Sequence, residues 1–257
     1  MAFSFYKYQG TGNDFVIIDN RRELFFKNDT KLIKLLCDRK FGIGADGLLL
    51  LQNHPEHDFT MVYYNADGNK SSMCGNGGRC IVHFARYLGL ISESATFEAV
   101  DGLHHATLQD DVVSLQMNEV RQIEAAESYT FLDTGSPHHV QWVENLSEFD
   151  VFSEGRKIRY DRYGAAGANV NFVEQLSENT VAVRTYERGV EDETLSCGTG
   201  VTAVALAAHQ RGKATGNSVR LQTRGGNLTV RFKKSGNAYV DIFLEGPATL
   251  VFKGEWL

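Results

Sequence analysis

Short apolar runs follow one another along most of this chain, and they predict a protein built mainly from strands. Each run has the length of a strand and is bounded by turn residues such as Gly, Asp and Asn. Residues 106–117 and 227–244 carry such runs on both sides of a turn and predict hairpins. We expect residues 249–257 to return to the first half of the chain as a strand. The other strand-like runs are residues 15–18, 46–52, 58–64, 140–143, 169–175 and 180–186.

Three segments have the spacing of helices instead. The first follows Asn28-Asp29-Thr30 and has a stop signal at Gly42. The other two, residues 79–88 and 201–211, are each followed by a glycine, the usual residue just past a helix end. The last helix is apolar nearly all round, and such a helix is buried on every side. We therefore expect the strands of its own half to enclose it.

The chain also repeats itself at a nearly constant offset. A shift of 123 positions carries a cysteine, several glycines and a Thr-Gly pair onto matching residues, and a shift of 122 aligns one further block. Blocks that recur in the same order indicate two similar halves, which we expect to be related by a pseudo-two-fold axis. The matching residues are Cys74 and Cys197, Gly75 and Gly198, Gly77 and Gly200, Gly89 and Gly212, Thr11-Gly12 and Thr134-Gly135, and residues 40–42 and 162–164.

These patterns predict an α+β fold of two pseudo-symmetric halves, each with strands around a central helix. The N-terminal half comprises residues 1–122 together with the strand at residues 248–257. The C-terminal half comprises residues 123–247.

Composition narrows the class of protein. The net charge of −6 and the pI of about 5.8 argue against nucleic acid as a partner, which would favour a basic surface. No apolar run approaches the ~18 residues that span a bilayer, and the first ten residues lack the apolar centre of a signal peptide. Four scattered cysteines do not form a disulfide framework in a chain of 257 residues. We therefore expect a cytoplasmic protein with reduced thiols and no membrane partner.

The repeated chemical feature is a cysteine directly before a glycine-rich turn and a helix. It occurs in SMCGNGGRC at residues 72–80 and in LSCGTGVTA at residues 195–203. A helix N-terminus leaves about four N–H groups without helical acceptors and carries roughly half a positive charge. Such an end binds carboxylate or phosphate and stabilises a thiolate. Each half therefore offers a reactive thiol beside an anion cradle.

Two such thiols facing one cleft can invert a carbon centre. One thiolate removes a proton from one face, the opposing thiol delivers a proton to the other face, and no cofactor is needed. Heavy atoms poised for transfer lie ~3–3.5 Å apart, so the two sulfurs should lie roughly 6–7 Å from each other. The helix ends would hold the substrate carboxylate as negative charge spreads into it.

Other interpretations of the cysteines and histidines stay open at this point. A cysteine in a single glycine-rich loop is more often structural than catalytic, and Cys37 and Cys80 fit buried small residues of helices. Cys74 and Cys197 could instead form a redox disulfide, although no C-x-x-C motif occurs. The histidines at positions 54, 57, 104, 105, 138 and 139 lack a regular zinc spacing with cysteine, so we expect no metal.

Two longer segments closely resemble the signature sequences of diaminopimelate epimerases. They are NADGNKSSMCGNGGRC at residues 65–80 and YERGVEDETLSCGTG at residues 186–200, and GTGNDFVIID and FGIGADGLLL resemble the family's N-terminal segments. The resemblance covers nearly the whole chain. It implies two halves that are each a mixed β-barrel around a central helix. It also implies cofactor-independent interconversion of LL- and meso-diaminopimelate in lysine biosynthesis, by a homodimer that uses no pyridoxal phosphate.

The resemblance also assigns roles to individual residues. Cys74 and Cys197 match the two acid/base thiols, and His138 matches a histidine beside a catalytic cysteine. Residues that match contacts to the carboxylate at the reacting centre are Gly75, Asn76, Gly198 and Thr199. Residues that match the other substrate contacts, including those at the distal amino-acid group, are Asn13, Asn65, Asn169, Glu187 and Arg188.

The sequence departs from the family pattern at three positions. Asn69 stands where a serine is usual, Ser136 where an asparagine is usual, and Gly47 where a glutamine is frequent. The nearest rival is a cysteine-pair racemase acting on proline or hydroxyproline. Glu187-Arg188 disfavours it, because a cyclic imino acid has no second carboxylate for an arginine fork to bind.

Overall fold

The chain folds into two compact units, each with its own core. The computed structural model describes residues 2–27, 29–71 and 73–257. Unit 1 comprises Met1–Leu115 and Gly246–Leu257, and unit 2 comprises Gln116–Glu245. Asn28, at the start of the first expected helix, and Ser72, in the first cysteine segment, lie outside the described residues. The described part contains no helix of the length and apolar character needed to cross a membrane.

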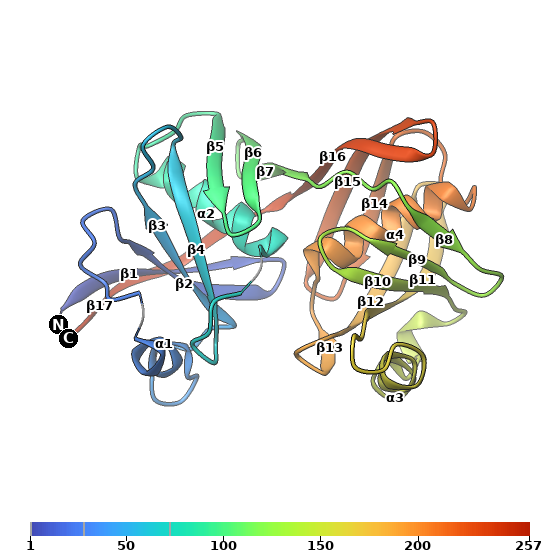
Figure 1. The fold of residues 1–257 in the computed structure, drawn as a ribbon, viewed down its shortest axis with the longest axis horizontal. Helices are drawn as coiled ribbons and strands as arrows, with labels where there is room; N and C mark the ends of the chain where they lie inside the picture. The colour runs from blue at the N-terminus through green and yellow to red at the C-terminus, as the bar shows by residue number, and fades with distance from the viewer. Residues whose placement is uncertain (1, 28, 72) are drawn as a thin grey trace. The chain divides into compact units, whose positions relative to one another are not determined.

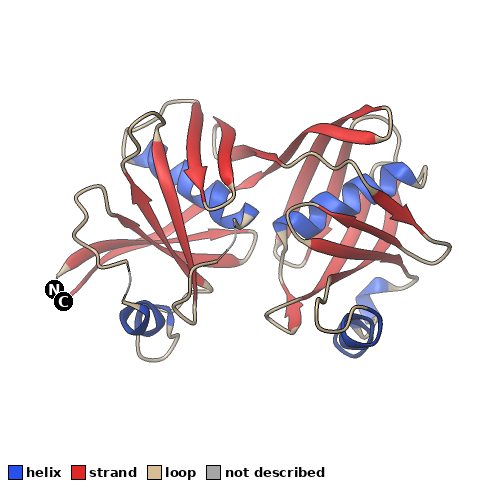
Figure 2. Cartoon of the chain, in the orientation of Figure 1, coloured by secondary structure: helices blue, strands red, loops and turns tan. Residues whose placement is uncertain are grey.

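Strands predominate in both units, and few helices accompany them (Figure 2). The elements of unit 1 are β1 (Phe3–Gly10), β2 (Asn13–Asp19), α1 (Thr30–Cys37), β3 (Gly47–Gln52), β4 (Phe59–Asn65), α2 (Gly75–Tyr87), β5 (Ser94–Ala99), β6 (Gly102–Gln109), β7 (Val112–Met117) and β17 (Thr249–Trp256). The elements of unit 2 are β8 (Ile123–Ala125), β9 (Thr130–Asp133), β10 (Pro137–Trp142), a 3₁₀ turn (Leu146–Glu148), α3 (Val151–Lys157) with a π-helical turn (Ile158–Arg162), β11 (Asn169–Ser177), β12 (Thr180–Glu187), β13 (Asp192–Thr194), α4 (Gly198–Gln210), β14 (Ser218–Thr223), β15 (Gly226–Ser235) and β16 (Ala238–Pro247).

The two units pair their strands in the same way, as the sequence repeat predicts. In unit 1, β2 runs parallel to β3, β3 is antiparallel to β4, and β4 runs parallel to β5. In unit 2 the corresponding strands β10, β11, β12 and β14 follow the same series of directions. A meander of antiparallel strands completes each unit, β5–β6–β7 in the first and β14–β15–β16 in the second. The fold is α+β with mixed sheets.

A long helix lies inside the strands of each unit (Figure 1). Every residue of α4 from Val201 to Ala208 is buried, which confirms the prediction from its apolar sequence. Both helices begin earlier than predicted, at Gly75 and Gly198 instead of positions 79 and 201. Their first turns are rich in glycine, which has a low helix propensity. Tertiary contacts outweigh that preference, because all the first-turn residues of α2 are buried.

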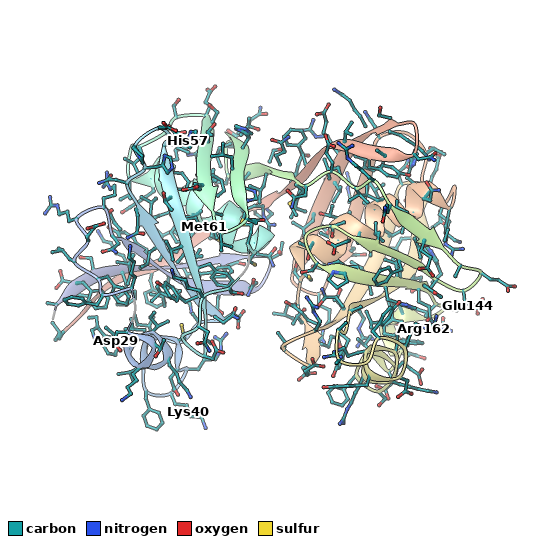
Figure 3. All side chains as sticks on the ribbon, viewed as in Figure 1. Asp29, Lys40, His57, Met61, Glu144 and Arg162 are labelled. Atoms are coloured by element: carbon teal, nitrogen blue, oxygen red, sulfur yellow. The ribbon has the colours of Figure 1, made fainter. Side chains whose placement is uncertain are left out.

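Helix α1 ends five residues before the predicted stop. Asp29 caps its start by accepting a hydrogen bond from the Leu32 N–H at 2.9 Å, and Figure 3 labels this residue. The helix ends at Cys37, because Asp38 adopts an extended conformation. The chain then folds back on the helix, so that a Cβ at Gly42 would lie 1.8 Å from the Leu35 carbonyl oxygen. Gly42 therefore permits a close approach after the helix has ended and is not its stop.

The last strand returns to the first strand of the chain. β17 pairs antiparallel with β1, from Phe3 with Trp256 to Gln9 with Thr249, and the two lie side by side in Figure 1. This pairing confirms the prediction for residues 249–257. Trp256 packs against the part of the unit 1 core that includes Phe5, Phe25 and Ile33. Unit 1 is thus completed by a segment that follows the whole of unit 2 in the sequence.

Candidate active site

A cysteine stands at the N-cap of each central helix. Cys74 precedes α2 with φ −111° and ψ 120°, and Cys197 precedes α4 with φ −122° and ψ 115°. The helix geometry directs the first N–H groups of each helix toward its cysteine. The positive helix end then favours an anion at the same place, either a thiolate or a bound carboxylate. The sequence repeat is therefore reproduced in the local geometry of the two thiols.

The other two cysteines are unsuited to acid/base chemistry. Cys37 and Cys80 are buried, and both are free thiols. Burial raises the pKa of each to about 12. A thiol with such a pKa remains protonated at neutral pH, so both residues serve as packing groups.

Cys74 belongs to a hydrogen-bonded group with two asparagines in unit 1. The Cys74 thiol donates to Asn13 Oδ1 at 3.5 Å, and Asn76 Nδ2 donates to the same oxygen at 3.3 Å. Asn13 Nδ2 in turn donates to Asp46 Oδ2 at 2.6 Å. The structure thus brings three residues singled out from the sequence, Asn13, Cys74 and Asn76, into one hydrogen-bonded group, and it adds Asp46.

Asp46 belongs to a charged network that fixes the start of β2. Arg39 bridges Asp14 and Asp46, with its Nη2 2.7 Å from a carboxylate oxygen of each. Lys7 pairs with Asp14 at 2.6 Å. Burial alone would raise the pKa of Asp14, but hydrogen bonds from Arg39 and Lys7 outweigh it and lower the pKa to about 2. Asp14 is therefore ionised at neutral pH. The network also fixes Asn13, through the hydrogen bond of its amide to Asp46.

Arg79 is a fully buried guanidinium one turn into α2. It donates to Thr11 Oγ1 at 3.1 Å and to the carbonyl oxygens of Gly75 and Pro247 at 3.4 Å each. Within the described residues it makes no ion pair with a carboxylate, and burial lowers its pKa. Thr11 has φ +52° in the tight turn between β1 and β2, so Arg79 helps to fix the turn that carries Asn13.

In unit 2, Cys197 lies beside Thr199 and His138. Cys197 Sγ is 3.5 Å from Thr199 Oγ1, and that oxygen is 2.9 Å from His138 Nε2. Thr134 Oγ1 also donates to the Thr199 carbonyl oxygen at 2.8 Å and ties the turn before β10 to the start of α4. The predicted neighbours of the second thiol are therefore in contact through a single hydroxyl group.

His138 is neutral at any physiological pH. The ring is fully buried, and burial together with the positive charge of Arg188 lowers its pKa to about 3. Asn171 Nδ2 lies 3.2 Å from His138 Nδ1, and Asn169 Nδ2 lies 3.4 Å from Nε2. His138 thus acts as a polar group of fixed orientation and carries no charge.

The remaining predicted residues lie farther from the thiols in the hydrogen-bond network. Asn65 is exposed at the end of β4 and starts a turn in which its carbonyl accepts from Gly68 N–H at 2.9 Å. Glu187 accepts from the Thr194 hydroxyl at 2.8 Å. Arg188 donates its backbone N–H to Asn169 Oδ1 at 2.8 Å, while its side chain is bonded to the Ala166 carbonyl at 2.9 Å. Asn169, Glu187 and Arg188 therefore gather where β11 begins and β12 ends.

The structure accounts for the departure at Gly47. A Cβ there would lie 2.5 Å from the ring of Tyr63 and 2.6 Å from the Tyr64 carbonyl oxygen, so no larger residue fits without a shift of the backbone. At Asn69, both the backbone N–H and the side-chain amide donate to Asp67 at 2.9 Å, which closes the turn after β4. The Ser136 carbonyl accepts from Thr134 N–H at 3.1 Å.

Sequence reasoning missed several polar residues around the thiols. Thr11 and Thr134 had been marked by the repeat, without a role. Asp46 and Asn171 each gave only a weak signal, a polar residue next to or inside a buried strand. Arg79 gave a stronger one, because a charged residue in the first turn of a helix enclosed by strands has to be buried with polar partners. Within residues 2–27, 29–71 and 73–257, no group of three or more His, Cys, Asp or Glu side chains is placed to hold a metal ion.

Solved structures of other proteins have the same fold. A PhzF-family phenazine biosynthesis protein from Bacillus anthracis matches with a TM-score of 0.80 at 15% identity, over 100% of this chain and 99% of that chain. A hydroxyproline epimerase from Agrobacterium vitis, with trans-4-hydroxy-L-proline bound, matches with a TM-score of 0.72 at 16% identity, over 99% and 92%. The chain therefore has the two-unit fold of these proteins.

Sequence comparison identifies the family within this fold. A family model for diaminopimelate epimerase matches residues 5–123 and 130–251. The diaminopimelate epimerase of Flavobacterium psychrophilum is 58% identical over 250 residues, which cover 96% of this chain and 98% of that protein. That of Chlorobaculum tepidum is 42% identical over 255 residues, which cover 95% and 98%. The chain belongs to the diaminopimelate epimerase family and is an amino-acid isomerase, which confirms the resemblance of its two cysteine segments.

Proposed function

We propose that this protein interconverts LL- and meso-diaminopimelate by a two-base mechanism that needs no cofactor. Cys74 and Cys197 act on opposite faces of one α-carbon. The thiolate of one removes the α-proton, and the thiol of the other delivers a proton to the opposite face, so that the centre is inverted. The observation that carries this proposal is the matching N-cap position of two cysteines in the two similar units of a diaminopimelate epimerase family member.

The helix ends supply the stabilisation that the intermediate requires. When the α-proton leaves, negative charge spreads into the neighbouring carboxylate. Fixed N–H dipoles aimed at that carboxylate stabilise the developing charge without reorganisation. We assign this role to the first turns of α2 and α4, at Gly75, Asn76, Gly198 and Thr199.

The distal amino-acid group of the substrate requires a second set of contacts. An arginine fork suits its carboxylate, and carboxylate or amide oxygens suit its ammonium. Arg188, Glu187 and Asn169 supply these groups at the adjoining ends of β11 and β12, and Asn13 and Asn65 complete the set on unit 1. Arg188 already lies close enough to Asn169 for a 2.8 Å backbone hydrogen bond, which supports their acting together.

Exchange of the α-hydrogen with solvent tests the proposal directly. Pure protein is incubated in D₂O with LL-diaminopimelate, without added pyridoxal phosphate or metal, and deuterium at the α-carbon is measured by NMR. We expect incorporation together with formation of the meso isomer. Trans-4-hydroxy-L-proline serves as the control substrate, because a hydroxyproline epimerase shares the fold at 16% identity. Exchange with hydroxyproline alone would contradict the proposed substrate.

Loss of either thiol gives a second test. We expect Cys74→Ala and Cys197→Ala each to abolish epimerisation, with a loss of at least ~10³-fold in kcat, because each proton transfer needs its own group. The variant that keeps the thiol on the face of the α-hydrogen should still eliminate a leaving group from a substrate analogue, because elimination requires only one base. Cys80→Ala is the matched control, since its thiol has a pKa of about 12. Activity that survives loss of either catalytic thiol would favour the redox alternative instead.

We further propose that the protein acts in the cytoplasm as a homodimer in lysine biosynthesis. The support is its membership of this family. Light scattering after gel filtration would test the dimer.

A further inference from the structure

We propose that the fold presents a hydrogen-bond acceptor to Cys74 and a hydrogen-bond donor to Cys197. Asp46 determines the first arrangement, and Asn171 determines the second. Asp46 turns an acceptor toward Cys74 and so favours its protonated form. Asn171 turns a donor toward Cys197, through His138 and Thr199, and so favours its thiolate. Asp46 acts through Asn13 and Asn171 acts through His138, so both are positioning residues. The inference rests on the proposed function only in taking these two thiols as the catalytic groups.

At Cys74 the polarity follows from the fixed amide of Asn13. An ionised carboxylate only accepts hydrogen bonds. The 2.6 Å contact with Asp46 therefore places the NH₂ group of Asn13 on the Asp46 side. Its oxygen then faces Cys74 Sγ at 3.5 Å and also receives the Asn76 amide at 3.3 Å. A protonated Cys74 can donate to this oxygen, whereas the thiolate would be repelled by it. The arrangement therefore favours the protonated form of Cys74.

At Cys197 the polarity follows from the fixed amide of Asn171. A backbone carbonyl only accepts, so the 3.0 Å contact with the His139 carbonyl identifies the NH₂ group of Asn171. The Thr185 hydroxyl donates to its oxygen at 3.0 Å. The same NH₂ group lies 3.2 Å from His138 Nδ1, which must therefore be the unprotonated nitrogen of the neutral ring.

The proton of His138 then resides on Nε2 and points toward the Thr199 hydroxyl, which in turn contacts Cys197. Nε2–H donates to Thr199 Oγ1 at 2.9 Å, which leaves the threonine hydroxyl proton for Cys197 Sγ at 3.5 Å. The Asn169 amide also approaches Nε2, at 3.4 Å, and this contact is longer than the 3.2 Å contact between the Asn171 amide and Nδ1. The nearer amide, from Asn171, thus decides the tautomer.

Other titratable and charged groups also affect the pKa of each thiol, and the test must keep them unchanged. Arg79 and Cys80 on α2 interact electrostatically with each other, and Arg79 also with Cys74. Asp46 reaches Cys74 through Asn13, and Arg39 joins Asp46 to Asp14 and Lys7. Cys197 is connected through Thr199 to His138 on β10, and the positive charge of Arg188 at the end of β12 acts on that ring. The buried cation of Arg79 favours a thiolate at Cys74 and so opposes the effect of Asn13. Comparison of variants that all retain Arg79 removes its contribution.

The pH dependence of alkylation measures the pKa of each thiol without turnover. The protein is treated with iodoacetamide at a series of pH values, and the rate at each cysteine, relative to its own plateau at high pH, is followed by mass spectrometry of peptides. For Asp46→Asn we expect the midpoint of Cys74 to fall by about one pH unit, tenfold in thiolate fraction, because one hydrogen bond is worth about that much. The midpoint of Cys197 should stay in place.

A double-mutant cycle separates the hydrogen bond from the charge of Asp46. Asn13→Ala removes the acceptor and should lower the midpoint of Cys74 by a similar amount. If Asp46 acts through Asn13, adding Asp46→Asn to Asn13→Ala produces no further shift. Additive shifts would show that Asp46 acts by its charge alone, and this would overturn its assigned role.

The second thiol has a matched set of variants. Thr199→Val should raise the midpoint of Cys197 by about one pH unit, whereas Thr199→Ser keeps the donor and should restore it. Thr202→Val, on the next turn of α4, is the control, because the Thr202 hydroxyl is engaged by the Gly198 carbonyl at 3.0 Å. An unchanged Cys197 midpoint in Thr199→Val would contradict a donor at this sulfur.

The tautomer of His138 can be observed directly by ¹H–¹⁵N NMR of histidine-labelled protein. His138→Gln identifies the signal, and we expect the neutral Nε2–H form in the wild type. Asn171→Asp places an acceptor beside Nδ1 and should move the proton to it. Observation of the Nδ1–H form in the wild type would overturn the role of Asn171, whether or not the protein is active on diaminopimelate.

Discussion

Two adjacent histidines on β10 remain uncharged because they are buried. His138 is 0% and His139 1% exposed, and burial is the largest cause of their low pKa values, about 3 and about 4. His139 has hydrogen-bond partners in Tyr163, at 2.8 Å, and Gln141. An unfolded chain would protonate both rings near pH 6.5. In the acidic range the unfolded state therefore binds more protons than the folded one.

This difference predicts the direction in which stability changes with pH. The contribution of His139 is fully present above about pH 6.5 and is lost progressively as the pH falls toward about 4. We expect His139→Gln to reduce the loss of unfolding free energy between pH 7 and pH 4.5, as measured by urea denaturation. Tyr163→Phe is the control, because it removes the hydroxyl partner and keeps the titrating ring. An equal slope in His139→Gln and wild type would show that this ring does not contribute.

The close approach at Gly42 sets a steric limit at a single residue. An alanine Cβ would lie 1.8 Å from the Leu35 carbonyl oxygen, a backbone atom that cannot move aside cheaply. We expect Gly42→Ala to lower the unfolding free energy by at least about 3 kcal/mol, the upper end for overpacking. Gly89→Ala is the comparison, because at φ +73° it meets no atom within 4 Å and pays only the left-handed penalty of about 1–2 kcal/mol. A Gly42→Ala variant as stable as Gly89→Ala would refute the steric account.

At the scale of the elements, the sequence predicted where α2 and α4 end better than where they begin. The ends are marked by Gly89 and Gly212, whose positive φ of 73° and 67° other residues rarely adopt. The beginnings carry glycine, asparagine and threonine, which by themselves favour loops. Only burial inside the strands makes these first turns helical, and burial is a property of the folded unit that local sequence does not carry.

Only part of the candidate site could be predicted from the sequence. The cysteines and the residues beside them form contiguous motifs, so the resemblance could identify them. Asp46 and Asn171 are single polar residues from other strands or loops, and only pairing of β2 with β3 and of β10 with β11 brings them to their partners. The charged network around Asp14 likewise joins β1, β2 and the loop between α1 and β3, and it has no signature in any one of them.

At the scale of the whole molecule, the repeat in the sequence predicted the duplicated strand pairing of the two units. A repeat does not reveal which strand completes which sheet. That role belongs to β17, which pairs with β1 at seven positions. One of these pairs places Gly254 directly opposite Phe5, close to its ring. The sequence could suggest this return only because residues 249–257 exceed the repeated length.

The pairing of β17 predicts an unequal response to truncation. We expect a chain that stops after Ala248 to lose protection of the β1 amides in hydrogen exchange, because those groups lose their partners on β17. The amides of α4 should exchange as in the full chain, since unit 2 keeps all its strands. Gly254→Leu is a milder variant with the same expected pattern, because its side chain would meet Phe5 at 2.6 Å. Unchanged protection of β1 in both variants would contradict this account.

The order of the strands also has a consequence for synthesis on the ribosome. β1 emerges early from the exit tunnel, but its neighbour β17 is translated only after the last residue of unit 2. Domains fold as units while translation proceeds. Unit 2 can therefore become native on the ribosome, while the nascent unit 1 carries an uncovered β1 edge until β17 has been translated. Until β17 arrives, that edge is open to pairing with other chains.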